Sequence, residues 1–176
     1  MSPAPSTEAL FSAWMAEHGP IVQKVARAYA RGEQERADLV RELMFQVWSS
    51  VPRFDGRARP GTWIYRVCLN TALTWRRSAG RRERRTDDGA DVAALDHPAP
   101  GPDRVAERND LLERVYAALH CLADLDRSLL LLQLDGLSYR EVAEVTGLSE
   151  NHVGVALTRA RQRLTAQLKG VIDELD

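Results

Sequence analysis

The sequence predicts an all-α protein made of two small helical domains joined by a flexible linker. Three observations predict this fold. Apolar residues recur at steps of three and four in both halves of the chain, which is the period of an amphipathic helix. Residues 86–103, between the halves, hold three prolines, two glycines and five aspartates without any apolar period, as is typical of a linker. In the C-terminal half, two short helix starts with matching residues follow one another.

The N-terminal half contains three predicted helices. The apolar periodicity places the first two at about 6–31 and 35–50 and the third at about 60–78. The second helix closes before Pro52, and the third opens at Pro60, because proline fits the first turn of a helix but not its interior. Between them lies a loop with a turn signal at its Asp-Gly pair.

The net charge of −1, from 24 basic and 25 acidic residues, conceals an uneven distribution. Residues 76–85 carry six arginines and one glutamate, whereas 86–103 carry five aspartates and neither Lys nor Arg. A compact cationic block indicates a phosphate contact, although a solvated helix end would carry the same charges. We expect domains at 1–80 and 109–176, with a basic and then acidic linker at 81–108.

The C-terminal half carries the signature of a helix-turn-helix. Ser138 and Glu141 form a capping box, and Ser149 repeats the N-cap at the start of a second helix. Gly147 lies between the two helices and supplies the left-handed residue that ends the first. In such a unit the second helix lies in the major groove of DNA. An ordinary helical hairpin has the same caps, so the signature alone leaves DNA binding open.

The second helix of this unit, at about 149–169, has an apolar and a polar face. The apolar stripe consists of Val153, Leu157, Ala160, Leu164 and Leu168. On the other face, Asn and Gln can read adenine, Arg can read guanine or hold phosphate, and Val or Thr can touch the thymine methyl group. The residues of this face are Asn151, Gly154, Val155, Thr158, Arg159 and Gln162.

Together the two halves resemble a bacterial RNA polymerase sigma factor of the sigma-70 family, of the extracytoplasmic-function (ECF) group, which has only regions 2 and 4. Residues 37–48 (ADLVRELMFQVW) look like the core-polymerase-binding helix. Residues 62–72 (TWIYRVCLNTA), with Arg76 and Arg77, resemble the promoter-melting helix. Residues 122–143, followed by Arg159-Ala160-Arg161, are similar to region 4. The resemblance covers about 8–78 and 110–170, in the order of the family.

The resemblance implies a transcription initiation factor that binds core RNA polymerase, melts the −10 region of promoter DNA and recognises the −35 region. The implied polymerase contacts are Asp38, Leu39, Arg41, Glu42, Phe45 and Gln46. The implied −10 contacts are Phe54, Arg57, Trp63, Tyr65, Arg66, Asn70, Arg76 and Arg77. The implied −35 contacts are Ser138, Arg140, Ser149, Asn151, His152, Val155, Thr158, Arg159 and Gln162. For Trp63, a position in the hydrophobic core is an equal alternative to a contact with the −10 DNA.

The chain departs from the family pattern in its recognition helix, where residues 153–157 (VGVAL) replace a stretch that is commonly richer in Lys, Ser and Arg. Fewer cations weaken the attraction to phosphate. We therefore expect this lobe to bind −35 DNA poorly by itself and to act when it is tethered to polymerase. The aspartates of the linker either mimic nucleic-acid charge in a basic channel or form a plain acidic spacer.

Two other classes of function remain open at this stage. The first is a two-domain helix-turn-helix regulator that acts on duplex DNA without polymerase, and the second is a helical adaptor without a DNA role. An enzyme is disfavoured, because the sequence has no Gly-rich phosphate loop, no His-Glu-x-x-His, no Cys-x-x-Cys and no nucleophile elbow. We expect neither a metal nor another cofactor, and a monomer when the chain is free.

The compartment is expected to be the cytoplasm. No apolar run approaches the roughly 18 residues that cross a bilayer, so stable membrane insertion is not expected, and the first residues lack the pattern of a secretory signal. Cys68 and Cys121 are expected to be buried free thiols. An anti-sigma factor is a further partner that the resemblance leaves open.

Overall fold

The computed structural model describes residues 6–85 and 103–173, with side chains placed for 6–78 and 111–169. This part of the chain is helical and contains no strand, so the predicted all-α class is confirmed. Residues 86–102, which include most of the acidic stretch predicted as a linker, lie outside the described residues.

The N-terminal lobe consists of α1 (Thr7–Tyr29), α2 (Glu33–Ser50), the short 3₁₀ helix η1 (Val51–Arg53) and α3 (Pro60–Arg85). The first two long helices start and end within two residues of their predicted limits. The predicted end of the third at residue 78 is wrong, because α3 continues to Arg85. Arginine is a good helix former, so the basic block extends the helix instead of opening the linker.

The C-terminal lobe consists of α4 (Asp103–His120), α5 (Asp124–Leu134), α6 (Tyr139–Thr146) and α7 (Glu150–Asp173). Helix α4 begins within the stretch predicted as a linker, five residues before its expected end. The last two helices form the predicted helix-turn-helix, and α7 starts close to the predicted residue 149.

The caps of the helix-turn-helix form as predicted. The amide of Glu141 donates to Ser138 Oγ (3.3 Å), and the Glu141 carboxylate accepts from the Ser138 amide (2.9 Å). Gly147 has a φ of +77° and donates its N–H to the Ala143 carbonyl (2.9 Å). Such left-handed geometry favours glycine. The sharp change of direction between α6 and α7 therefore has a local origin in the sequence.

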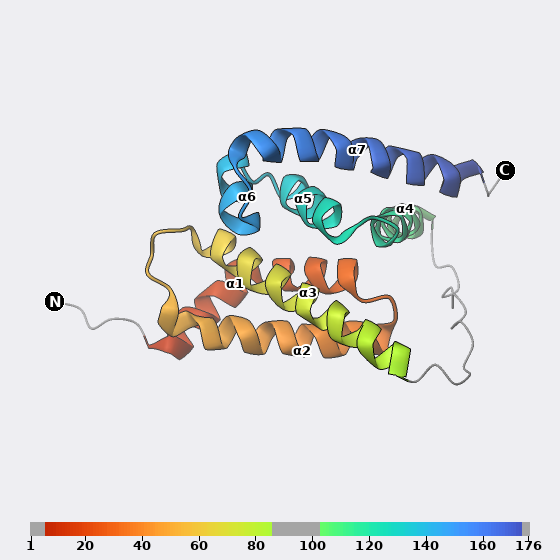
Figure 1. Ribbon diagram of the computed structural model, residues 1–176. Coiled ribbons are helices and arrows are strands. Elements are labelled where there is room, and N and C mark those ends of the chain that lie inside the picture. Colours follow the sequence, from red (N-terminus) through yellow and green to blue (C-terminus); the bar gives the residue numbers. More distant parts are fainter. Residues whose placement is uncertain (1–5, 86–102, 174–176) are drawn as a thin grey trace.

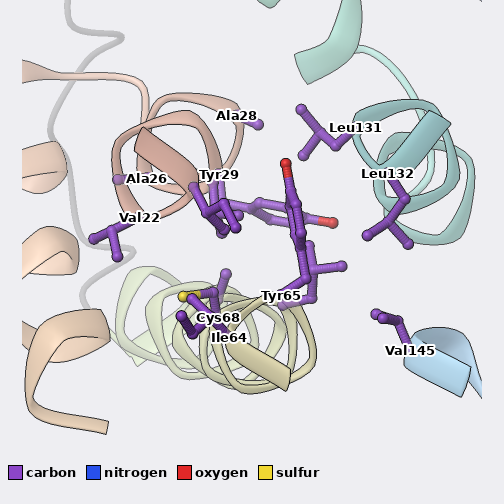
Figure 2. Close-up of a cluster of buried hydrophobic side chains, with 14 of the residues drawn as sticks. Val22, Ala26, Ala28, Tyr29, Ile64, Tyr65, Cys68, Leu131, Leu132 and Val145 are labelled. Carbon is purple, nitrogen blue, oxygen red and sulfur yellow. The ribbon is translucent and has the colours of Figure 1, made fainter. Parts of the chain in front are cut away.

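The two lobes pack directly against each other (Figure 1). Helices α1 and α3 face α4, α5 and α6 across a seam that is partly apolar. Figure 2 shows Val22 and Ile64 of the N-terminal lobe in the same buried cluster as Leu131, Leu132 and Val145 of the C-terminal lobe. The described helices thus share one continuous core.

The two cysteines have different environments. Cys68 is fully buried in α3, as predicted, and burial raises the pKa of its thiol to about 12. The prediction that Cys121 is buried is wrong, since it lies exposed in the turn that follows α4. In the part of the chain that the structure describes, no helix combines the length and the apolar character needed to cross a membrane.

Candidate polymerase and promoter interfaces

The predicted polymerase contacts other than Leu39 lie along the solvent-facing side of α2. Asp38, Glu42 and Gln46 follow one another at four-residue steps, and all three are half-buried. Arg41 donates to the Asp38 carboxylate (2.5 Å), and the Gln46 amide donates to Glu42 (2.9 Å). Pairs at these spacings support a helix, and the Gln34 amide also donates to both oxygens of Asp38 (3.3 and 3.4 Å).

An apolar strip runs beside these polar residues. Phe45 is 61% exposed, and Met44 and Trp48 are each 39% exposed. Large apolar side chains that remain in water next to charged ones are typical of a protein interface. Leu39 differs from the other predicted polymerase contacts because it is fully buried and packs α2 onto the lobe.

The predicted −10 loop is anchored by a column of aromatic rings. The Phe54 ring lies between Trp14 and Trp63, with ring centroids 5.0 Å and 5.6 Å away. The Trp63 indole N–H donates to Ser50 Oγ (3.0 Å). Trp63 is half-buried and packs against the core beneath the loop, so part of its ring stays exposed and its predicted DNA contact stays a prediction.

The tip of the loop, residues 55–57, is exposed. The Asp55 carboxylate accepts from the Arg57 amide (3.1 Å), and Gly56 has a φ of +74°. The Arg57 side chain is 90% exposed. A short turn held by its own aspartate therefore presents one arginine to solvent.

The predicted DNA contacts on α3 divide into two groups. Asn70 and Arg77 are exposed. Tyr65 is only 1% exposed and donates its hydroxyl hydrogen to Asp135 of the C-terminal lobe. Arg66 and Arg76 are half-buried and also reach the C-terminal lobe. In this arrangement three of the predicted promoter contacts have protein partners across the seam.

The helix-turn-helix leaves its reading face in solvent. On α7, Val153, Leu157 and Ala160 of the predicted apolar face are fully buried. Its last two residues, Leu164 and Leu168, are half-buried. The predicted DNA contacts are all exposed; they are Ser138, Arg140, Ser149, Asn151, His152, Val155, Thr158, Arg159 and Gln162. Gly154, which lies on the same face, is half-buried beside the Tyr139 ring.

The sequence analysis missed the residues that receive the α3 side chains. Asp124 and Asp135 accept from Arg76 and Tyr65, and no local pattern marks them as acceptors. Trp14 was also missed, although an aromatic residue on the apolar face of the first helix was a signal for core packing. Among the described residues, no group of His, Cys, Asp or Glu is arranged to hold a metal ion.

Several groups have shifted pKa values with local causes. Hydrogen bonds from the amide and hydroxyl of Ser138 lower the pKa of Glu141. Burial, together with nearby Arg127, lowers the pKa of His120 to about 4. Burial and the hydrogen bond to Asp135 raise the pKa of Tyr65. His120 is therefore neutral and Tyr65 protonated at neutral pH.

The two lobes match known protein families in the order in which they occur. Residues 14–82 match Sigma-70 region 2, and residues 112–164 match Sigma-70, region 4. The ECF RNA polymerase sigma-E factor of Haemophilus influenzae is 27% identical over 139 residues, which cover 75% of this chain and 74% of the relative. The RNA polymerase sigma factor NccH of Alcaligenes xylosoxydans xylosoxydans is 28% identical over 163 residues, 90% of this chain and 87% of that protein.

Solved structures share the fold. The sigma factor RpoE in complex with the anti-sigma factor NepR from Bartonella quintana superposes with a TM-score of 0.71 at 22% identity, over 90% of this chain and 96% of that chain. CnrH in complex with the cytosolic domain of CnrY has a TM-score of 0.63 at 26% identity, over 94% and 90%. With regions 2 and 4 in place and ECF relatives across most of its length, this chain belongs to the ECF group of the sigma-70 family and directs RNA polymerase to promoters.

Proposed function

We propose that the exposed side of α2 is the surface that docks on core RNA polymerase. Its carboxylates, Asp38 and Glu42, and its apolar strip, led by Phe45, form one continuous solvent-facing surface. Acidic groups around an apolar centre suit a partner with basic residues around an apolar groove. Leu39 and Arg41 support this surface, the first by packing and the second by pairing with Asp38.

We further propose that the −10 element is contacted by the loop tip and by α3, and the −35 element by α7. The observation that carries the second assignment is the capped helix-turn-helix whose polar face is fully exposed. Region 2 would then span 1–80 and region 4 would span 109–176. Sigma factors are non-enzymatic transcription factors, and we propose that this chain likewise carries out no catalysis and acts in the cytoplasm beside polymerase.

An anti-sigma factor is proposed as a further partner. Among the solved structures that share this fold, the sigma factor RpoE was solved in complex with the anti-sigma factor NepR, and CnrH in complex with the cytosolic domain of CnrY. In the free chain, Met44, Phe45 and Trp48 form an exposed apolar strip. A partner bound there would remove this apolar surface from water, which stabilises the complex. The binding partner is expected to be a polypeptide whose apolar side chains pack on this strip.

The test is reconstitution with bacterial core polymerase that lacks any sigma factor. Specific transcripts from genomic DNA are expected only when this chain is added. Glu42→Lys should reduce polymerase binding at least tenfold, because it reverses a charge at the docking surface. Glu17→Lys is the matched control, since Glu17 is an exposed acid on α1, away from the docking surface.

A second pair of variants tests the −35 assignment. Asn151→Ala should lower initiation and relax the base preference at one −35 position, by about 1–3 kcal/mol for a lost bidentate contact. Gln167→Ala, an exposed polar residue farther along α7, should leave both unchanged. Sequence-specific binding to duplex DNA that needs no polymerase would instead favour the alternative, a helix-turn-helix regulator acting alone.

A further inference from the structure

The reading face of α7 contains apolar groups among its polar residues. Val155 lies in the second turn of the helix and is 54% exposed. Thr158 is also exposed and lies three residues further, which makes it a neighbour of Val155 on the helix surface. The Thr158 hydroxyl donates to the Gly154 carbonyl (2.9 Å). Because this hydrogen bond uses the hydroxyl hydrogen, Thr158 keeps a methyl group but no free donor for a partner.

Tyr139 adds a third side chain to this apolar surface. It is the first residue of α6, it is 42% exposed, and its ring lies against α7 at Gly154. A Cβ at position 154 would lie 3.4 Å from the ring, so a side chain longer than that of alanine would displace the ring from the helix. The absence of a side chain at Gly154 therefore joins Tyr139 to the surface of Val155 and Thr158. We call these three exposed residues the apolar reading patch.

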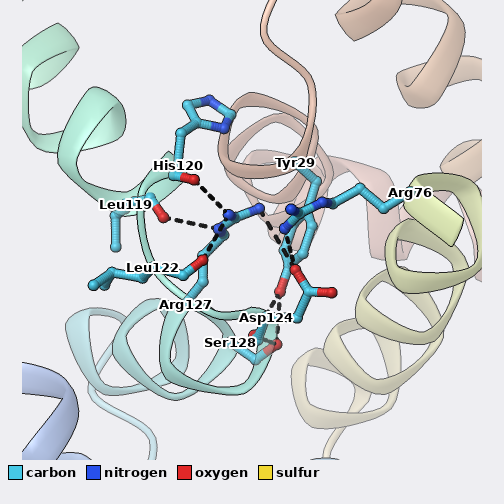
Figure 3. A network of polar contacts seen from close by, with 8 residues as sticks. All are labelled: Tyr29, Arg76, Leu119, His120, Leu122, Asp124, Arg127 and Ser128. Carbon is cyan, nitrogen blue, oxygen red and sulfur yellow. Dashed lines mark hydrogen bonds and ion pairs between the residues drawn. The ribbon is translucent and has the colours of Figure 1, made fainter. Parts of the chain in front are cut away.

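The helices that support the patch are fixed to one another by buried polar contacts. Asp126 of α5 is 5% exposed and accepts from Arg163 of α7 (2.5 Å). The next residue, Arg127, is 1% exposed and binds the end of α4 (Figure 3). Its guanidinium donates to the backbone carbonyls of Leu119 (2.9 Å), His120 (2.9 Å) and Leu122 (3.0 Å). The patch therefore lies on a preorganised surface, and preorganisation lowers the entropy cost of binding.

The major groove of DNA offers one kind of group that matches such a patch. The base edges there carry hydrogen-bond donors and acceptors, and the C5-methyl group of thymine is the methyl group among them. 5-Methylcytosine carries the same group at the same position. A polar base edge pressed against Val155 would lose its water without gaining a hydrogen bond. The patch therefore favours a pyrimidine with a C5-methyl group.

Polar residues on both sides of Val155 would place it opposite a base. Asn151 lies four residues before it and Arg159 four residues after it, and both are exposed on the same side of α7. Asparagine can bind adenine, and arginine can bind guanine. Base contacts of a recognition helix come from its N-terminal turns, where Val155 also lies. The arrangement thus puts an apolar contact between two hydrogen-bonding ones.

We propose that the apolar reading patch binds the C5-methyl group of one pyrimidine in the −35 element, and that this factor recognises the position by its methyl group. Tyr139 is then a specificity-determining residue of α6, in addition to the residues of α7. The proposal deepens the proposed assignment of α7 to the −35 element and rests on it.

The test measures how tightly core polymerase that carries this chain binds a promoter duplex identified from its transcripts. Each thymine of the −35 element is replaced in turn by deoxyuridine, which removes the methyl group and keeps the base pair. In a second arm, each cytosine is replaced by 5-methylcytosine. One position is expected to change the affinity about fourfold, the effect of burying one methyl-sized group. A loss with deoxyuridine identifies thymine as the source of the methyl group, and a gain with 5-methylcytosine identifies the modified base.

Protein variants show whether the patch recognises this methyl group. Val155→Ser removes both methyl groups of valine, and its holoenzyme should bind the methylated and unmethylated duplexes equally. Thr158→Ser removes one methyl group and keeps a hydroxyl, so the fourfold ratio should fall to about twofold. Thr165→Ser is the matched control and should keep the full ratio, because Thr165 is exposed farther along α7 and likewise donates to a backbone carbonyl, that of Arg161 (3.0 Å).

Tyr139→Ala tests the contribution of α6 to the patch. The ratio between the methylated and unmethylated duplexes should fall, since the ring no longer covers one side of the methyl group. Thermal unfolding of the same variant shows whether the domain remains folded. A full ratio in a folded Tyr139→Ala variant would overturn the role of Tyr139.

Three outcomes separate this proposal from the role of α7. A methyl effect of equal size in the wild type and in Val155→Ser would overturn the proposal, because another side chain or the DNA itself would then be its source. No methyl effect at any position, with binding that still depends on the −35 sequence, would overturn the proposal and leave the role of α7 intact. Equal binding of a promoter with a scrambled −35 element would contradict the role of α7 itself.

Discussion

The aromatic column under the −10 loop leads to a prediction about how that loop is held. Phe54 makes edge contacts with Trp14 and Trp63, and each aromatic pair contributes about 0.5–1.5 kcal/mol beyond its buried area. Phe54→Leu removes both contacts, so the free energy of unfolding should fall by about 1–3 kcal/mol. The loop tip that presents Arg57 should lose its fixed position at the same time.

A double-mutant cycle isolates the contact between Phe54 and Trp14. Urea unfolding of Phe54→Leu, Trp14→Leu and the double variant should give a coupling energy of about 0.5–1.5 kcal/mol. Phe11 is the control, because it lies on the same helix as Trp14 and packs on Trp48 (5.1 Å). A cycle of Phe54→Leu with Phe11→Leu should give a coupling energy below about 0.5 kcal/mol.

A variant of Trp63 distinguishes two roles for this residue, support of the loop and stacking on a DNA base. Trp63→Phe keeps an aromatic ring but loses part of the ring volume and the hydrogen bond to Ser50, whose hydroxyl still donates to the Val47 carbonyl (2.8 Å). A loss of about 0.5–1.5 kcal/mol in unfolding free energy is expected, with little change in promoter opening by the holoenzyme. No coupling between Phe54 and Trp14, or a large loss of promoter opening by Trp63→Phe without loss of stability, would refute this reasoning.

Two further predictions concern stability. Gly154→Ala should stabilise the chain to thermal unfolding by about 0.5–1 kcal/mol, because a Cβ there would lie 3.4 Å from the Tyr139 ring, an ordinary contact; a lower midpoint would contradict this. The pKa of His120 is about 4 in the folded chain and near 6.5 in the unfolded chain. Between about pH 4 and pH 6.5, His120 therefore binds a proton in the unfolded state and not in the folded state. Stability should therefore fall as the pH is lowered from about 6.5 to 4, and His120→Gln should reduce that fall in urea titrations; an identical pH dependence would exclude His120 as its source.

The features that depended on neighbouring residues could be predicted from the sequence. The Ser138 capping box, the left-handed Gly147 and the buried stripe on α7 each involve groups within a few residues of one another. Side-chain chemistry at such short range determines the backbone almost regardless of context. The same holds for the exposed reading face, which follows from the helical period once the buried stripe is known.

The features that depended on distant residues could not be predicted. Tyr65 meets Asp135 across 70 residues of sequence, and Arg66 meets the Glu144 carbonyl across 78. An aromatic and basic helix was therefore interpreted as a free DNA surface, although a large part of it packs on the other lobe. The end of α3 was misjudged for a different reason, because its arginines are compatible with both a helix and a linker.

The distribution of charges along the chain fits a factor that depends on polymerase for its affinity for promoter DNA. The recognition helix has few cations on its reading face, and two arginines of α3, Arg66 and Arg76, contact the C-terminal lobe. Weak phosphate attraction in the free protein can be compensated by tethering, since a bound polymerase raises the effective concentration of each DNA element.

The most direct measurement is the affinity of the full chain for a duplex promoter, with and without core polymerase at physiological salt. The promoter is one identified from the transcripts that the reconstituted polymerase makes with this chain. The account predicts specific binding with core polymerase present and binding at least a hundredfold weaker, without sequence preference, for the free chain. Tight and sequence-specific binding by the free chain, unchanged when core polymerase is added, would contradict it.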